Sequence, residues 1–229
     1  MYPLYAYVLL ASFSVPLLYT IFVQDFIKNW KEFTISTTLV ATVFIIWDVF
    51  FTKEGIWGFS HQYCLDIRIF TLPIEEWLFF FVIPFCSLFT HFAFFYAFPN
   101  FQLNRLAAYV ISGVVLLTAL VLILFHLDRA YTVVNYSFVA GTTLLAMLYD
   151  IQTLRKFSVS FLIILVPFFI VNGILTGAIT DTPVVWYNHA ENLDLRLYTI
   201  PIEDMGYAWS MLLGNLLIFY KLKRQNKSL

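Results

Sequence analysis

The chain has 229 residues, of which 61% are hydrophobic and 12% are charged, and its net charge at pH 7 is −1. Soluble domains carry about 25% charged residues, so the charged residues of this chain are too few to cover an aqueous surface. The small net charge also leaves no strongly basic face for nucleic acid. The composition therefore predicts an integral membrane protein and argues against a nucleic-acid partner.

Seven apolar stretches follow one another along the chain, in the manner of helices that cross a bilayer. They cover residues 3–24, 33–52, 72–97, 106–126, 132–149, 158–180 and 200–220. The connections between them are short except for two, residues 53–71 and 181–199. We predict an all-α integral membrane protein of about seven transmembrane helices.

The distribution of Lys and Arg predicts how these helices are oriented. Four of the 13 basic residues fall on the side of the N-terminus and the two long connections: Lys53, Arg68, Arg129 and Arg196. The other nine fall on the side of the C-terminal tail. Because cytoplasmic loops carry the excess of Lys and Arg, we expect a multi-pass protein of the inner cell membrane. Its C-terminus would be cytoplasmic and the two long connections would lie on the opposite face.

An eleven-residue segment occurs twice, each time at the end of a long connection. Residues 66–76 align without a gap with residues 194–204, and six of the eleven positions are identical. Four predicted spans separate the copies, so both have the same orientation, and parallel repeats tend to build one site between them. We predict a first repeat at residues 1–97, a bridging span with its loops at 98–131, and a second repeat at 132–229 with a basic cytoplasmic tail.

The four acids of the repeated motif, Glu75, Glu76, Glu203 and Asp204, are the candidate catalytic residues. A structural explanation exists, because Pro is favoured at the first position of a helix and acids in the first turn are stabilised by the helix dipole. The duplication and the aromatic, apolar surroundings favour a functional role, since carboxyl groups there are costly unless paired or protonated. We expect at least one neutral acid beside an ionised one, which would divide acid and base roles. Sequence alone does not assign those roles.

Other residues near the motifs are candidates for supporting roles. Asp48 and Asn172 lie within predicted spans, where polar side chains are rare, although Asn172 could serve only to bond a neighbouring helix. Arg68 and Arg196 precede the motifs at equivalent positions. Aromatic faces stabilise a cation that is shielded from water. The aromatic residues grouped around the motifs are Trp57, Trp77, Trp186, Tyr187 and Trp209.

Several kinds of site have no signature in the sequence. It contains neither GxGxxG nor GxxxxGK[ST], and its two cysteines have no metal-ligand spacing. Every lysine lies outside the predicted spans or at their ends. We therefore expect no cofactor and no metal ion. Acids, bases and aromatic side chains within a membrane protein suit proton chemistry on a lipid-soluble hydrocarbon.

At this point the sequence resembles a known family. Two membrane repeats that each carry Pro-x-Glu-acid, here Pro73-Ile-Glu-Glu and Pro201-Ile-Glu-Asp, are similar to the lycopene cyclase family of the heterodimeric bacterial and fungal type. Residues 55–59, 172–177 and 183–188 resemble that family as well. The resemblance covers essentially the whole chain and implies the fused, two-repeat form.

The resemblance implies an isomerase that closes the linear ψ-end of lycopene to a β-ring without net oxidation. In that reaction a carboxylic acid protonates C1=C2, the resulting cation closes onto C5=C6, and a base removes a proton from C6. The motif acids would be catalytic, Asp48 and Asn172 would support them, and Trp57 and Trp186 would stabilise the cation. Expected partners are the lipid-soluble polyene, membrane lipid and other carotenoid-pathway enzymes.

Two other functions remain open. A small transporter or proton-linked carrier would bind a cation with the repeated acids, but it would need a polar face through the depth of several spans. Spans one, two, three and seven have few polar residues in their middles. An accessory membrane subunit without activity would use the motifs only for packing.

Overall fold

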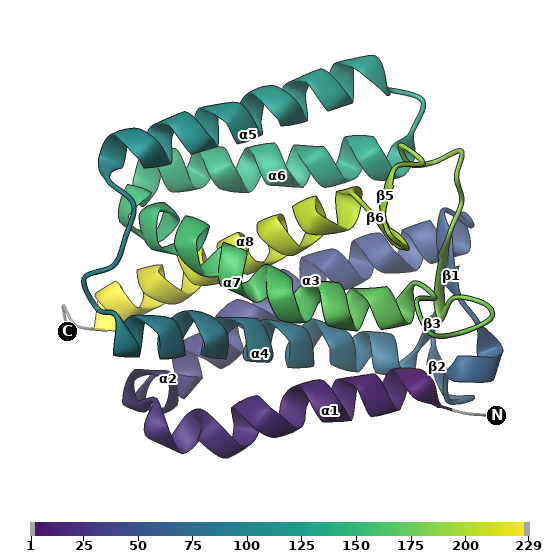
Figure 1. Ribbon diagram of the computed structural model, residues 1–229, viewed down its shortest axis with the longest axis horizontal. Helices are drawn as coiled ribbons and strands as arrows, with labels where there is room; N and C mark the ends of the chain where they lie inside the picture. The colour runs from purple at the N-terminus through teal and green to yellow at the C-terminus, as the bar shows by residue number, and fades with distance from the viewer. Residues whose placement is uncertain (1–2, 227–229) are drawn as a thin grey trace.

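The computed structural model describes residues 3–226; residues 1–2 and 227–229, the outer ends of the two predicted repeats, lie outside that part of the chain. Eight α-helices form most of it: α1 (Leu4–Tyr19), α2 (Gln24–Lys28), α3 (Trp30–Lys53), α4 (Ile74–Ala97), α5 (Arg105–Phe125), α6 (Ala130–Tyr149), α7 (Ile151–Leu175) and α8 (Glu203–Asn226). The long helices run alongside one another in one bundle, with α1 and α5 at opposite edges (Figure 1).

Five helices, α3 to α7, are long and apolar enough to cross a membrane. The prediction of a helical membrane protein is therefore confirmed. Helix α1 has 16 residues, fewer than the roughly 20 that a bilayer core requires, and α8 carries two acids in its first turn. The count of seven spans depends on these two helices and stays a prediction.

The sixth predicted span differs from the helix at both ends because of local caps. Helix α7 begins at Ile151, since the Asp150 side chain accepts a hydrogen bond from the Thr153 N–H at 3.2 Å and so caps the helix. The helix ends at Leu175, and Gly177 follows with a φ of +103°. Glycine adopts this left-handed conformation without steric cost. The chain therefore turns out of the helix before residue 180.

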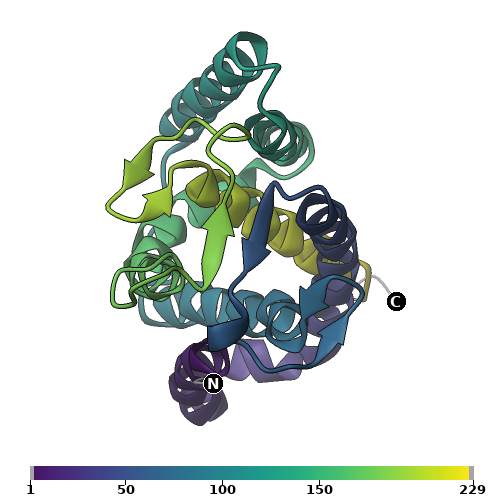
Figure 2. The same cartoon turned by 90° about the vertical axis from the view of Figure 1, so that its right-hand side faces the viewer.

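Helix α8 lies near the middle of the bundle and contacts α3, α4, α6 and α7 (Figures 1 and 2). Its Asn215 is fully buried and bonds to α3. Ser36 Oγ donates to Asn215 Oδ1 at 2.7 Å, and Asn215 Nδ2 donates to Thr37 Oγ1 at 3.1 Å. Because neighbouring helices satisfy its polar groups, α8 can be less apolar than a helix that faces lipid.

The two long connections, which the sequence predicts only as loops, contain short strands that meet at one end of the bundle (Figure 2). Strands β1 (Trp57–Phe59) and β4 (Val185–Tyr187) pair antiparallel, with Trp57 opposite Tyr187 and Gly58 opposite Trp186. Successive side chains of a strand point to opposite faces. Trp57 and Tyr187 therefore share one face of this strand pair, and Trp186 lies on the other.

Each motif is preceded by a short hairpin. The strands are β2 (Arg68–Ile69) with β3 (Leu72–Pro73), and β5 (Arg196–Leu197) with β6 (Ile200–Pro201). The turns contain Phe70 and Tyr198 with φ of +55° and +59°, a conformation that bulky residues rarely adopt. The same uncommon turn thus occurs in both copies of the repeated segment.

The arginine of each hairpin braces its turn. Arg68 Nη1 donates to the Thr71 carbonyl oxygen at 2.9 Å, and Arg196 Nη1 donates to the Thr199 carbonyl oxygen at 2.5 Å. A charged donor makes this hydrogen bond stronger than a neutral one would. This contact gives a structural reason for the recurrence of Arg and Thr beside the motif.

Gly58 should be the residue of the β1–β4 pair that tolerates substitution least. A Cβ at Gly58 would lie 2.4 Å from Trp186 Cζ2, so Gly58→Ala must displace the indole. We expect a loss of roughly 1–3 kcal/mol in the free energy of unfolding, as for other overpacked sites. Thermal unfolding in detergent measures the loss. Gly113→Ala on α5, where a Cβ meets no atom within 4 Å, is the control and should not destabilise the protein.

Candidate active site

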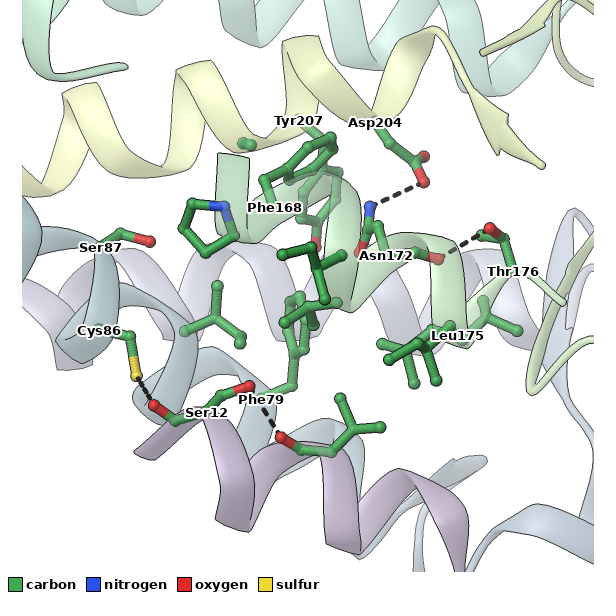
Figure 3. A pocket seen from close by; sticks show the side chains of 18 of the residues that line it. Ser12, Phe79, Cys86, Ser87, Phe168, Asn172, Leu175, Thr176, Asp204 and Tyr207 are labelled. Atoms are coloured by element: carbon green, nitrogen blue, oxygen red, sulfur yellow. Dashed lines mark hydrogen bonds between the residues drawn. The ribbon is translucent and has the colours of Figure 1, made fainter. Parts of the chain in front are cut away.

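A cavity of about 650 Å³ lies between α1, α4, α7 and α8, and the β1–β4 pair lines one end of it. Most of its walls along the helices are apolar, and Val8, Ile83, Phe168 and Met211 are examples. Figure 3 shows side chains of α8 and α7 facing those of α4 and α1 across this space. The carboxyl-bearing side chains that line it are Asp48, Glu76 and Asp204. The cavity is thus an apolar chamber with acids on its wall.

Each motif contributes one acid to the cavity. Glu76 and Asp204 line it, whereas Glu75 and Glu203 are fully buried outside its lining. Neighbouring residues on a helix point in directions about 100° apart. The two acids of one motif therefore occupy different environments.

Glu75 and Glu203 hold the loop that leads into their own helix. Glu75 Oε1 accepts a hydrogen bond from the Leu65 N–H at 2.6 Å, and Glu203 Oε1 accepts one from the Leu193 N–H at 2.7 Å. Glu203 Oε1 also accepts a hydrogen bond from Thr132 Oγ1 of α6 at 2.8 Å. These contacts fix the hairpins, and with them the start of α4 and α8.

In the first half of the chain the cavity acid is paired with a second carboxyl group. Tyr5 Oη donates to Glu76 Oε2 at 2.5 Å. The carboxyl group of Asp48, on α3, interacts with that of Glu76, and its Oδ2 is buried without a donor. Asp48 Oδ1 accepts hydrogen bonds from Trp57 Nε1 at 2.5 Å and Thr52 Oγ1 at 3.3 Å. Two carboxyl groups can be hydrogen-bonded to each other only when one of them carries a proton.

In the second half the cavity acid is surrounded by neutral donors. Asp204 accepts hydrogen bonds from Tyr131 Oη at 2.5 Å, Tyr187 Oη at 3.0 Å and Asn172 Nδ2 at 3.2 Å (Figure 3 shows the last). Burial, and then the charge of Asp204, raise the pKa of the Tyr187 phenol well above its ordinary value. Tyr187 therefore remains a donor. It also interacts electrostatically with Glu76, so it links the two halves of the site.

Two of the five aromatic residues singled out in the sequence line the cavity. Trp57 and Tyr187 do so from β1 and β4, with ring centroids 6.2 Å apart. Tyr131 lies against both, 5.0 Å from Trp57 and 5.8 Å from Tyr187. These rings form an aromatic wall beside the carboxyl groups.

The other three lie outside the cavity lining. Trp77 packs on Phe70 of the first hairpin with 6.3 Å between ring centroids. Trp186 is 42% exposed, because the register of the strand pair turns it to the opposite face from Trp57. Trp209 is buried against Phe157, with 4.9 Å between ring centroids. Their contacts are those of packing residues.

The remaining sequence candidates are placed as follows. Arg68 and Arg196 brace the hairpin turns and do not line the cavity, although the Arg196 guanidinium lies 5.8 Å from the Tyr187 ring centroid.

Cys64 is buried beside the first motif, and burial followed by the charge of Glu75 raises the pKa of its thiol to about 12. It is therefore not a nucleophile. In the described part of the chain, no three His, Cys, Asp or Glu side chains are grouped as ligands of a metal ion.

Three tyrosines of the site were not identified from the sequence. Tyr5 and Tyr131 each donate to the cavity acid of one motif, and Tyr207 of α8 lines the cavity one turn after Asp204. A signal existed: Tyr5 and Tyr131 are separated by nearly the same number of residues as the motifs. Among 14 tyrosines in the chain, that spacing is not distinctive without a known repeat boundary.

Comparison with protein families gives a match to the lycopene cyclase family over two segments, residues 2–95 and 128–222. The two segments contain one motif each and leave α5 between them. Comparisons with curated proteins and with solved structures gave no match. The matched segments cover most of the chain and include every residue that contributes a carboxyl group to the cavity. The chain is a fused, two-repeat member of the lycopene cyclase family.

Proposed function

We propose that this protein converts the linear ψ-end of lycopene into a β-ring by acid and base catalysis, as an isomerase that uses no cofactor. The observation that carries the proposal is the pairing of one apolar cavity with three carboxyl-bearing side chains, Asp48, Glu76 and Asp204. A polyene end is apolar, so the chamber suits it. The reaction needs a proton donor and a proton acceptor, and the carboxyl groups can serve as both.

The reaction balances without an oxidant or reductant. A carboxylic acid adds a proton to C2 of the C1=C2 double bond and leaves a tertiary cation at C1. The electrons of C5=C6 form the C1–C6 bond, and the charge moves to C5. A carboxylate then removes the proton from C6 and restores C5=C6 within the ring. Proton transfer by positioned carboxyl groups contributes about 10²–10⁴-fold to such a rate.

The aromatic wall would protect the intermediate cation. Trp57 and Tyr187 face the cavity beside the acids, and Tyr207 does so from α8. Ring faces attract a cation that is shielded from water. A wall of this kind would also keep water from trapping the cation as an alcohol.

The proposed roles divide the four motif acids by what they touch. Glu76 and Asp204 would act on the substrate, because they line the cavity. Glu75 and Glu203 would position them, because they hold the loops at the start of α4 and α8. Asn172 would support Asp204 through its hydrogen bond.

We propose that seven helices cross the membrane. Helix α1 continues as a 3₁₀ turn at Thr20–Phe22, which brings it near the required length. Helix α8 is surrounded by other helices, which lessens the cost of its polar residues. Residues 1–97 and 132–229 would be parallel halves and residues 98–131, with α5, the bridge. The protein would lie in the inner cell membrane. The excess of basic residues near the C-terminus would place that end in the cytoplasm and the cavity acids near the opposite face.

A carrier function is less well supported. A proton-linked carrier needs polar groups along a path through the membrane. Here the cavity acids lie near the end of the bundle that holds the strands, and beyond them the lining includes Val8, Ile83, Phe168 and Met211. An apolar chamber suits a hydrocarbon better than an ion.

The cavity would receive its substrate from the bilayer. Tyr7, Val15 and Ile170 line it although they are 50%, 58% and 61% exposed, which marks an opening between α1 and α7. In a membrane this opening would face lipid. A long polyene could then insert one end while the rest of the molecule stays among the acyl chains.

Narrowing that opening should slow the enzyme. Ala11 is an exposed residue of α1 that lines the cavity. We expect Ala11→Trp to lower the rate of ring formation roughly tenfold or more, or about 1.4 kcal/mol in the barrier. Ser14→Trp is the matched control, because Ser14 is exposed on the same helix and does not line the cavity. Equal rates for the two variants would count against entry between α1 and α7.

Expression in cells that accumulate lycopene tests the proposed function. Chromatography of the extracted pigments should show carotenes with β-rings and a corresponding loss of lycopene. Unchanged lycopene in cells that contain folded protein would contradict the proposal and leave the accessory-subunit interpretation in its place.

A further inference from the structure

The two halves of the carboxyl cluster differ at one decisive position. In the first half, Glu76 has a carboxyl group, that of Asp48, as its neighbour; in the second half, Asp204 accepts a hydrogen bond from an amide, that of Asn172. Each cavity acid also accepts one hydrogen bond at 2.5 Å from a tyrosine of the helix that opens its matched segment, Tyr5 or Tyr131. Glu76 and Asp204 therefore share a tyrosine donor but differ in their second neighbour, which is a carboxyl group for Glu76 and an amide for Asp204.

A hydrogen bond between the Asp48 and Glu76 carboxyl groups requires one proton, and the other hydrogen bonds of the two groups indicate where that proton resides. Asp48 accepts N–H or hydroxyl hydrogen bonds from Trp57 and Thr52, whereas Glu76 accepts one, from Tyr5. Hydrogen bonds donated to a carboxylate favour its charged form. Asp48, which accepts more of these hydrogen bonds, thus holds the charge, and Glu76 holds the proton as a carboxylic acid.

Asp204 is held in the opposite state. It accepts three hydrogen bonds, from Tyr131, Tyr187 and Asn172, and the amide of Asn172 can donate to it but has no proton to share. Each of these hydrogen bonds favours an ionised carboxylate, which is the state of a base.

We infer that the two halves have opposite roles: Glu76, paired with Asp48, is the acid that protonates C2, and Asp204 is the base that removes the proton from C6. This inference rests on the proposed function. The proton leaves the Glu76 hydroxyl with its bonding electrons staying on oxygen, and a proton from C6 is taken up by the Asp204 carboxylate. The substrate keeps its composition. Asp48 is a positioning residue that keeps the proton on Glu76 before the reaction.

The type of ring formed distinguishes an acid from a base. The acid acts before the ring closes, so its loss lowers the amount of every ring type alike. The base acts after closure, when the cation at C5 can instead lose a proton from C4, which gives an ε-ring, or from the methyl group on C5, which gives a γ-ring. Loss of the base therefore redirects the product.

The experiment expresses the full chain in lycopene-accumulating cells and separates the rings by chromatography. Glu76→Gln should lower total ring formation by roughly 10²–10⁴-fold with any residual rings of the β type. Asp204→Asn should still form rings, with a raised share of ε- or γ-rings. Asn172→Asp gives Asp204 a carboxyl partner and should shift the ring type in the same direction, which a purely structural role of this position would not do.

Asp66→Asn and Glu54→Gln alter exposed acids outside the cavity lining and should match the wild type in yield and ring type. Thermal unfolding in detergent confirms that each variant is folded. Only β-rings, or no rings, from folded Asp204→Asn would overturn the assignment of Asp204, and a changed ring type from Glu76→Gln would overturn that of Glu76. If the wild type itself forms no ring, the proposed function fails instead.

Discussion

Glu76→Gln should nearly abolish ring formation while leaving the protein folded. The substitution keeps the size of the side chain and an oxygen that can accept the Tyr5 hydrogen bond, but removes the acidic proton. General acid catalysis is worth about 10²–10⁴-fold, so the rate of lycopene consumption should fall by that factor. The purified variant should unfold within about 1 kcal/mol of the wild type, as expected when a side chain of equal size replaces another.

The measurement compares Glu76→Gln with Glu54→Gln in the same membranes. Glu54 is an exposed glutamate that follows α3 and does not line the cavity, so the control loses the same chemical group outside the cavity. Pigment analysis over time gives the two rates. Wild-type turnover by folded Glu76→Gln would show that another group supplies the proton.

Glu203→Ala, in contrast to Glu76→Gln, should cause a large loss of stability. The variant removes the acceptor of two hydrogen bonds, from the Leu193 N–H and from the buried Thr132 Oγ1, and leaves both donors without this partner beside a void. Hydrogen bonds to charged groups contribute about 1.5–3 kcal/mol each. We expect the free energy of unfolding to fall by roughly 3 kcal/mol or more, with activity lost because the start of α8 is no longer held.

Glu203→Gln serves as the control for that variant. Its side-chain oxygen can still accept both hydrogen bonds, so it should lose less stability than Glu203→Ala and keep more activity. Thermal unfolding in detergent ranks the three proteins. If Glu203→Ala unfolds at the temperature of the wild type, the loop contact is not what holds this acid in place.

The sequence was sufficient to propose the motif acids as site residues but not to predict which of them line the cavity. The repeat, the paired motifs and the apolar stretches predicted a membrane protein with acids contributed by two halves. Which acid of each pair faces the cavity depends on how α4 and α8 are rotated about their axes where they begin. The loops before the helices set that rotation, through contacts such as those of Leu65 with Glu75 and Leu193 with Glu203. A neighbouring acid differs by one residue in sequence and by about 100° in direction.

The aromatic candidates illustrate a second limit. Trp57 and Trp186 have similar positions before the two motifs, so the sequence suggested equal roles. Their strands pair with Trp57 opposite Tyr187 and Gly58 opposite Trp186, and a shift of one residue in a strand turns a side chain to the other face. Strands of three residues are too short to display the alternating pattern that would reveal this register. Contacts between helices distant in sequence, such as that of Tyr5 on α1 with Glu76 on α4, are likewise invisible until the helices are assembled.

The most direct test of the central claim uses purified protein in lipid vesicles that contain lycopene, with no nucleotide, flavin or reductant added. Cyclisation by the cavity acids alone predicts a product of unchanged mass that carries β-rings, formed by the wild type and by Glu54→Gln but not by Glu76→Gln. Lycopene that persists with folded wild-type protein, or ring formation that proceeds equally well in Glu76→Gln, would contradict the account.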